Sequence, residues 1–181
     1  MSGSLLDLDL PTPEATRELG FALARVLQPR DVLFLEGPLG AGKTYLAQAI
    51  ALGLGVSPDE PITSPTFTLV QEWPTALPVL HADLYRLGDA RELEELGIRE
   101  RVFDDAALVV EWGERFATAI SRDGLRVSLT MRDGDARHAQ LEARGPRGEA
   151  MLAALREDVL RSRGAASRPS QLRPANRLET K

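Results

Sequence analysis

The chain has 181 residues, of which 43% are apolar and 5% aromatic, and its formal net charge is −5. This length and composition are those of one ordinary globular domain. Cysteine is absent, which excludes disulfide frameworks, thiolate zinc sites and thiol nucleophiles. No apolar run approaches the roughly 20 residues that span a bilayer, and aspartates stand near the N-terminus where a signal peptide would carry positive charge. We therefore expect a cytoplasmic protein with no membrane contact.

The charge is unevenly distributed along the chain. Residues 161–181 hold six basic residues and one acidic residue, whereas residues 1–160 hold 16 basic and 26 acidic residues. So acidic a body is a poor primary binder of nucleic acid, whose affinity comes largely from neutralising phosphates with lysine and arginine. We expect residues 1–160 to form the folded domain and residues 161–181 to be a disordered basic tail. Contact of this tail with RNA or with a partner is the alternative.

Hydrophobic periodicity and turn residues predict alternating helices and strands. In chain order these are a helix at 14–27, a strand at 31–36, a helix at 43–54, strands at 66–73 and 79–83, a helix at 89–96, a strand at 106–112, a hairpin of 125–131 with 137–143, and a helix at 146–160. This alternation is typical of an α/β protein. We predict a three-layer α/β/α fold with a mostly parallel central sheet and an antiparallel hairpin added near the C-terminal part.

Residues 37–44 fit the phosphate-loop pattern G-x-x-x-x-G-K-[ST] and lie between a predicted strand and a predicted helix. They are Gly37, Pro38, Leu39, Gly40, Ala41, Gly42, Lys43 and Thr44. Glycines let successive backbone N–H groups turn toward one anion, and the helix adds the positive end of its dipole. Lys43 is predicted to reach the β and γ phosphates and Thr44 to bind Mg²⁺, which indicates a P-loop NTPase. The alternative is a glycine-rich turn with a chance lysine.

A magnesium ion in such a site needs acidic support, usually from a carboxylate at the end of a neighbouring strand. Asp83 ends the strand VLHAD and Glu111 ends ALVVE, so both are predicted to lie at the carboxyl edge of a central sheet. Each could bind Mg²⁺ directly, bind it through water, or orient the attacking water. The alternatives are a cap or turn for Asp83 and an ordinary surface acid for Glu111.

The segment Ser64, Pro65, Thr66, Phe67 and Thr68 carries three hydroxyls after the predicted phosphate-loop helix. Many nucleotide hydrolases have a loop here that senses the γ-phosphate, so this segment is a candidate switch. The alternative is a polar turn that leads into a strand.

Aromatic and histidine side chains give weaker signals. Trp112 directly follows Glu111, and on a strand these two side chains would point to opposite faces of the sheet. Burial of Trp112 is the default expectation, with an aromatic wall beside the nucleotide as the alternative. His81 and His138 are not spaced as a metal pair, so we expect both to be structural.

Taken together, five segments resemble the bacterial TsaE family, formerly YjeE, over residues 14–116. They are GPLGAGKT, SPTFTLV, HADLYRL, ELEELGI and VVEWGER, in this order. The combination is far more specific than the phosphate loop, which any P-loop NTPase shares.

The resemblance implies an ATPase of tRNA threonylcarbamoyladenosine biosynthesis that works with the TsaB and TsaD proteins. Those proteins transfer the threonylcarbamoyl group to adenosine 37 of tRNAs that read codons starting with A, and the ATPase contacts tRNA only indirectly. ATP and Mg²⁺ are the implied cofactors, and hydrolysis is expected to be slow alone and to cycle the complex. A metabolite kinase and a non-hydrolysing nucleotide-binding adaptor are the alternative functions.

The resemblance also implies roles for individual residues. Lys43 and Thr44 would bind phosphate and Mg²⁺, and Asp83 and Glu111 would serve the metal. With Lys43, these two acids are the expected catalytic residues. Trp112 would lie near the nucleotide, and residues 64–68 would act as the responsive switch.

Overall fold

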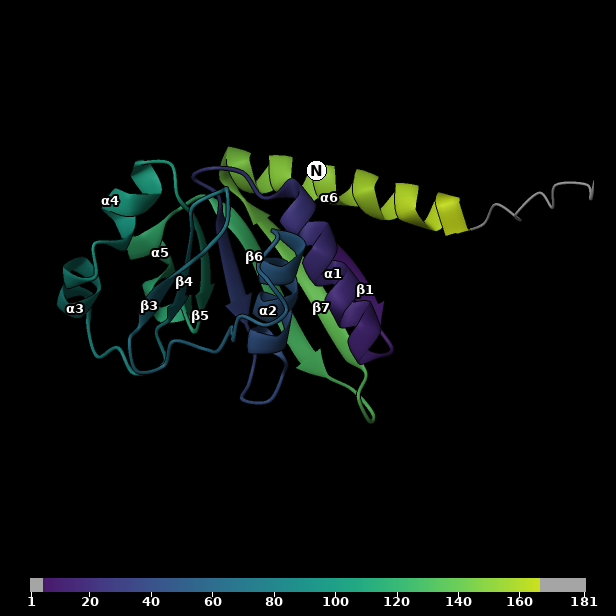
Figure 1. Cartoon of the computed structure of the whole chain (residues 1–181), viewed down its shortest axis with the longest axis horizontal. Helices are drawn as coiled ribbons and strands as arrows, with labels where there is room; N and C mark the ends of the chain where they lie inside the picture. The colour runs from purple at the N-terminus through teal and green to yellow at the C-terminus, as the bar shows by residue number, and fades with distance from the viewer. Residues whose placement is uncertain (1–4, 167–181) are drawn as a thin grey trace, which may run out of the picture.

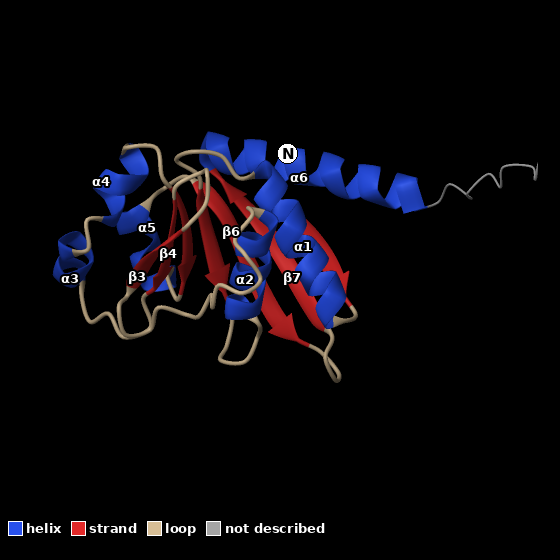
Figure 2. Cartoon of the chain, viewed as in Figure 1, coloured by secondary structure: helices blue, strands red, loops and turns tan. Residues whose placement is uncertain are grey.

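The computed structural model describes residues 5–166, which form one seven-stranded mixed sheet with helices on both faces (Figures 1 and 2). The strand order is β1-β7-β6-β2-β5-β4-β3. The strands are β1 (Leu5–Leu10), β2 (Val32–Glu36), β3 (Val70–Trp73), β4 (Val79–Asp83), β5 (Ala107–Glu111), β6 (Gly124–Met131) and β7 (Arg137–Arg144). The central strands β4, β5, β2 and β6 are mutually parallel, whereas β3, β7 and β1 add antiparallel pairs at the two edges.

The helices form one layer on each face of the sheet. They are α1 (Pro13–Val26), α2 (Lys43–Gly53), α3 (Ala90–Glu95), α4 (Ile98–Phe103), the 3-10 helix η1 (Glu114–Phe116), α5 (Ala117–Ile120) and α6 (Gly145–Ala166). One apolar core joins α1, α2 and α6 to the sheet, and a second core joins α3, α4, η1 and α5 to its other face. The predicted three-layer α/β/α fold and the β6–β7 hairpin are therefore confirmed.

Strand β2 is buried along its whole length because it lies between two parallel neighbours, β5 and β6. An apolar run without alternation is what a strand covered on both faces requires. The chain leaves β2 at Glu36 and enters α2 at Lys43, so the phosphate loop lies at the carboxyl edge of the parallel strands. In open α/β sheets this edge is where ligands bind.

The helices α1 and α2 lie side by side and approach each other closely (Figure 1). A Cβ placed on Gly20 of α1 would overlap Ala49 of α2, and one placed on Gly53 of α2 would overlap Ala24 of α1. Small residues at these positions allow this close packing. Because α2 begins at the phosphate loop, the α1–α2 contact also helps to fix the position of that loop.

Several elements differ from the sequence prediction. Strand β1 was not expected, although LLDLDL alternates apolar and acidic residues, and it pairs with β7 at the edge of the sheet. The predicted strand 66–73 is wrong in its first half: Leu69 adopts φ 64° and its N–H bonds to the Pro65 carbonyl, which makes a turn, so β3 begins at Val70. A further helix, α4, follows Gly97.

The structure bears on the expected boundary between a folded domain of residues 1–160 and a tail of residues 161–181. Helix α6 continues past residue 160 and ends at Ala166, so the expected boundary falls inside a helix. The rest of the expected tail, residues 167–181, lies outside the described residues. Across residues 5–166, no helix is both long and apolar enough to cross a membrane.

Candidate functional site

The phosphate loop joins β2 to α2 with three glycines in backbone conformations that other residues rarely adopt. Gly37, Gly40 and Gly42 have φ values of 134°, 80° and 103°. At Gly37 a side chain is also excluded by space, because a Cβ there would overlap the Leu129 carbonyl oxygen of β6. No side chain caps the N-terminus of α2 at Gly42, so the amides of its first turn remain available to an anion. The loop thus has the geometry of a phosphate site.

Lys43 is buried beneath this loop. Its Nζ donates hydrogen bonds to the carbonyls of Gly37 at 2.7 Å and Pro38 at 3.0 Å, and it lies 3.8 Å from the ring centroid of Trp112. Burial lowers the pKa of the ammonium, and the nearby carboxylates Glu111, Glu114 and Asp83 oppose this effect. A cation held in this way is ready to exchange its carbonyl partners for phosphate oxygens.

The two predicted acids meet at the edge of the sheet. Asp83 ends β4 and Glu111 ends β5, and they are direct register partners in the parallel pair. Both side chains are buried, with residues 3% and 2% exposed. Thr44 Oγ1 donates to Glu111 Oε2 at 2.8 Å, which links β5 to the first turn of α2. The expectation that both carboxylates lie at the carboxyl edge of the central sheet is confirmed.

These oxygens fit Mg²⁺ in their chemistry. Mg²⁺ prefers oxygen ligands and usually takes one or two carboxylates, several waters and substrate phosphates rather than a complete protein cage. Thr44 and Glu111, which are hydrogen-bonded to each other, offer a hydroxyl and a carboxylate, and Asp83 offers a second carboxylate that already accepts three hydrogen bonds. Within residues 5–166, no group of three or more His, Asp or Glu is placed to hold a metal ion by itself.

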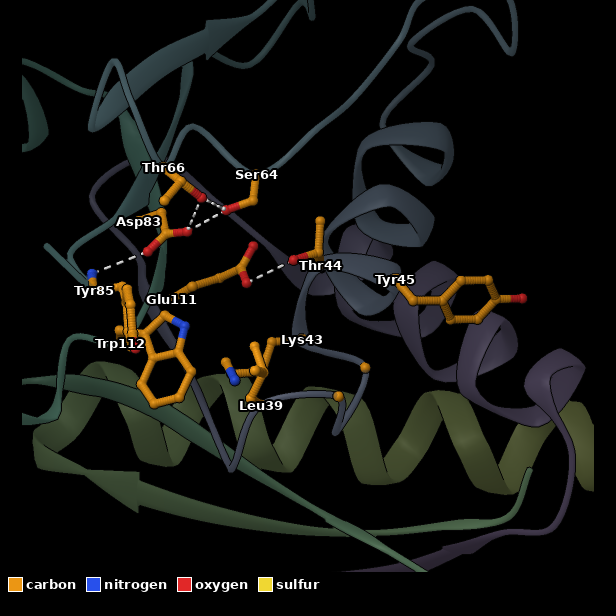
Figure 3. A pocket seen from close by; sticks show the side chains of 12 residues that line it. Leu39, Lys43, Thr44, Tyr45, Ser64, Thr66, Asp83, Tyr85, Glu111 and Trp112 are labelled. Atoms are coloured by element: carbon orange, nitrogen blue, oxygen red, sulfur yellow. Dashed lines mark hydrogen bonds between the residues drawn. The ribbon is translucent and has the colours of Figure 1, made fainter. Parts of the chain in front are cut away.

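Residues 64–68, here called the hydroxyl segment, contact the site through two of their five residues. Thr66 Oγ1 donates to Asp83 Oδ2 at 2.9 Å, and Ser64 Oγ donates to the same oxygen (Figure 3). The other carboxylate oxygen, Oδ1, accepts the backbone N–H of Tyr85 at 3.0 Å. Pro65 is buried, whereas Phe67 is 83% exposed and Thr68 is also exposed. The predicted switch therefore has one polar side facing Asp83 and an exposed side facing outward.

Trp112 lines the site together with Glu111, although strand alternation predicted opposite directions for these neighbours. The chain has already left β5 at Trp112, which adopts φ 58°. This left-handed conformation turns the indole toward the phosphate loop, where it contacts Lys43 and lies 5.0 Å from the Tyr85 ring. The expectation of opposite faces is wrong, and the alternative of an aromatic wall in the site is the one observed.

A cavity of about 430 Å³ brings these groups together (Figure 3). Its lining residues are Leu39, Gly40, Gly42, Lys43, Thr44, Tyr45, Ser64, Thr66, Asp83, Tyr85, Glu111 and Trp112. Of the predicted site, Gly37, Pro38, Ala41, Pro65, Phe67 and Thr68 are not among these lining residues. The volume is within the range of small-molecule sites.

Sequence reasoning missed four residues at or beside this site. Tyr45 and Tyr85 line the cavity, although Figure 3 shows the Tyr45 ring pointing away from the other labelled groups. His81, expected to be structural, is fully buried with Nε2 2.9 Å from Glu111 Oε1. Arg137 of β7 donates from Nε to the Ala41 carbonyl of the phosphate loop at 3.0 Å. Tyr85 and His81 lie in the quoted HADLYRL segment, whereas no local pattern indicated Tyr45 or Arg137.

Comparison with known proteins decides the family. A family model described as "Threonylcarbamoyl adenosine biosynthesis protein TsaE" matches residues 10–139. The chain belongs to the TsaE family. This match confirms the resemblance seen in the sequence and extends it through β6 into the beginning of β7.

Similar proteins from several bacteria carry the name tRNA threonylcarbamoyladenosine biosynthesis protein TsaE. The relative from Treponema pallidum is 38% identical over 121 residues, which cover 66% of this chain and 88% of the relative. The relative from Bacillus subtilis is 36% identical over 138 residues, or 76% of this chain and 85% of the relative. The relative from Mycobacterium tuberculosis H37Rv is 42% identical over 130 residues, or 66% and 76%.

A solved structure agrees with this family assignment. The crystal structure of YdiB from Bacillus subtilis superimposes with a TM-score of 0.72 at 28% sequence identity. The superposition covers 84% of this chain and 95% of YdiB. The predicted P-loop NTPase fold is therefore confirmed at the level of the whole TsaE domain.

Proposed function

We propose that this chain is a Mg²⁺-dependent ATPase that supports formation of threonylcarbamoyladenosine at position 37 of tRNAs reading codons that start with A. The observation that carries the proposal is the convergence of Lys43, Thr44 and Glu111 in one cavity at the N-terminus of α2. Membership of a family named for threonylcarbamoyl adenosine biosynthesis supports the pathway. The chain would act with the TsaB and TsaD proteins and would not itself transfer the group.

Phosphate binding is assigned to the loop and its lysine. The backbone N–H groups of residues 39–44 would surround the phosphates, and Lys43 would leave the Gly37 and Pro38 carbonyls to neutralise the β and γ phosphates. Trp112 would remain beside the ammonium as a wall of the site. Binding energy in such a site comes mostly from positioning and charge.

The hydroxyl of Thr44 and the carboxylate of Glu111 would hold Mg²⁺. Mg²⁺ held by these two side chains would supply positive charge to offset the negative charge that develops on the phosphate during transfer to water. Asp83 is assigned a different task, because Ser64 and Thr66 share its Oδ2 and the Tyr85 N–H binds its Oδ1. It would hold the hydroxyl segment at the γ-phosphate end and help to orient the attacking water.

The composition of the cavity supports the proposed dependence on partners. Among the described residues that line it, lysine is the single cationic type and there is no arginine. An arginine that stabilises the transition state accelerates phosphoryl transfer by about 10³–10⁵-fold in other P-loop enzymes. We propose that hydrolysis is slow in the isolated chain and that a TsaB–TsaD complex completes or reorganises the site.

The test is steady-state ATP hydrolysis by the purified chain, alone and with TsaB and TsaD from the same cell. Glu111→Gln removes the carboxylate charge at the proposed metal site, and Glu94→Gln removes the same charge from an exposed position on α3 as a matched control. We expect partners to stimulate the wild type and Glu94→Gln, and Glu111→Gln to stay near the background. Stimulated turnover in Glu111→Gln would refute the metal assignment. Transfer of the phosphate to a small hydroxylated acceptor, in place of release, would show a kinase.

A further inference from the structure

The histidine of β4 contacts the proposed metal carboxylate, yet the proposed function gives it no task. His81 is 0% exposed and Glu111 is 2% exposed. An imidazole in such surroundings is costly unless its nitrogens find hydrogen-bond partners. His81 has one on each side: Nε2 lies 2.9 Å from Glu111 Oε1, and Nδ1 lies 3.4 Å from Gln71 Nε2.

The neighbours of this imidazole fix the direction of its hydrogen bonds. Gln71 Nε2 also lies 3.2 Å from the Thr63 carbonyl, which can only accept, so the amide nitrogen of Gln71 must point to that side. The same nitrogen then donates to His81 Nδ1, which must accept. With Nδ1 accepting, the N–H of the imidazole is on Nε2 and is donated to Glu111 Oε1.

Glu111 is consequently held at both of its oxygens. Oε1 accepts from His81 on β4, and Oε2 accepts from Thr44 on α2 at 2.8 Å. His81 reaches Glu111 diagonally across the sheet, because its direct register partner is Val109 and Glu111 is two residues farther along β5 on the same face. The bond from His81 leaves Oε2 as the oxygen that faces Thr44 and the cavity.

We infer that His81 is a positioning residue that orients the Glu111 carboxylate toward Thr44 and Mg²⁺, with Gln71 fixing the tautomer of the imidazole. The inference rests on the proposed function, since it concerns the metal carboxylate of that site. Side chains that hold a metal carboxylate or histidine in this way commonly affect metal affinity by about 10–100-fold. His81 acts through Glu111 and does not itself touch nucleotide.

Two amide substitutions separate positioning from packing. The amide nitrogen of glutamine reaches about as far along the side chain as Nε2 of histidine, whereas that of asparagine stops near the place of Nδ1. His81→Gln therefore keeps a donor for Glu111, and His81→Asn does not. Both replace a buried aromatic ring by a buried amide, and they differ from each other by one methylene group.

The measurement is binding of a non-hydrolysable ATP analogue by calorimetry, in Mg²⁺ and in EDTA, and the quantity compared is the ratio of the two affinities. We expect His81→Asn to lower this Mg²⁺ enhancement by about tenfold or more, with the affinity in EDTA changed by less than about twofold. His81→Gln should restore the enhancement to within about threefold of the wild type. Thermal unfolding of each variant verifies that it is folded.

A third variant keeps the test decisive if His81→Asn fails to fold. Gln71 lies on the edge strand β3 and is half-buried, so Gln71→Ala spares the imidazole and removes the donor to Nδ1. We expect Gln71→Ala to lower the Mg²⁺ enhancement by about threefold. This effect is smaller than that expected for His81→Asn, because the imidazole stays in place and only the hydrogen bond that selects its tautomer is removed.

The outcomes distinguish this inference from the proposed function. An unchanged enhancement in His81→Asn or, if that variant is unfolded, in Gln71→Ala would overturn the inference, as would equal losses in the asparagine and glutamine variants. The proposed metal site would still stand if the wild type shows the enhancement and Glu111→Gln abolishes it. No enhancement in the wild type would refute the proposed function and the inference together.

Discussion

A methyl group added at Gly20 would test how tightly α1 holds the helix that follows the phosphate loop. Glycine in the interior of a helix costs about 0.8–1.0 kcal/mol relative to alanine, so Gly20→Ala at an open site would stabilise the protein by about that amount. Here the new Cβ would overlap Ala49 Cβ and would lie 3.1 Å from both Ala49 C and Ile50 N. Overpacking of this kind costs about 1–3 kcal/mol. We therefore expect a net destabilisation of up to about 2 kcal/mol.

A second substitution on the facing helix should reverse much of this loss. Ala49→Gly alone is expected to cost about 2 kcal/mol, from helix propensity and the removed buried methyl group. In the double variant the methyl group moves from α2 to α1 and the propensity terms cancel. Its unfolding free energy should lie within about 1 kcal/mol of the wild type, because the backbone contacts of the new Cβ remain.

Urea unfolding of the wild type, both single variants and the double variant gives the coupling between the two sites. We expect the double variant to be about 2–3 kcal/mol more stable than the sum of the single effects predicts, whereas sites without contact add within about 0.5 kcal/mol. Additive single effects would refute the close α1–α2 packing.

Three further predictions concern the site and its border. Lys43→Ala should weaken binding of an ATP analogue by about 10–150-fold in calorimetry, since a charged hydrogen bond is worth about 1.5–3 kcal/mol; an unchanged affinity would show that the loop binds no phosphate. Burial raises the pKa of Glu36, although its contact with Arg126 opposes this shift. Glu36 therefore contributes to the free energy of unfolding at low pH, and this contribution is lost as the pH rises through the raised pKa. Glu36→Gln should accordingly gain thermal stability relative to the wild type as the pH rises from 4 to 8, and a constant difference across this range would contradict the assignment. Trp112 contacts Lys43, whereas Trp73 is buried in the core. Nucleotide should therefore alter the tryptophan fluorescence of Trp73→Phe and leave that of Trp112→Leu unchanged. A fluorescence response retained in Trp112→Leu would show that Trp112 is not in the site.

Local sequence patterns were sufficient for the parts of the site that depend on local structure. The phosphate loop is contiguous, and its glycines and helix start can be read from eight residues. Asp83 and Glu111 could be placed because each ends an apolar run, and parallel strands bring such ends to one edge. Neither inference needed knowledge of which strands are neighbours.

The features that were missed depend on distant pairings or on unusual backbone conformations. Strand β1 is stabilised by β7, more than 120 residues later, so its short alternating run gave no sufficient signal alone. The contact of His81 with Glu111 exists only because β4 lies beside β5 in the observed register. Trp112 departs from strand alternation because of a left-handed residue conformation, which tryptophan rarely adopts.

The hydrogen bonds divide the site into two parts with different freedom to move. Glu111 is fixed between β4 and α2, two regular elements whose positions are set by the sheet and by the contact with α1. Asp83 is instead bonded to Ser64 and Thr66, which belong to a connection without regular structure whose next residue, Phe67, is largely exposed. Loops of this kind open at lower free-energy cost than buried strands and helices. If the chain binds ATP as proposed, a change at the γ-phosphate should leave Glu111 in place and displace the hydroxyls that bind Asp83. The exposed side of residues 64–68 is then where we expect a partner to sense the nucleotide.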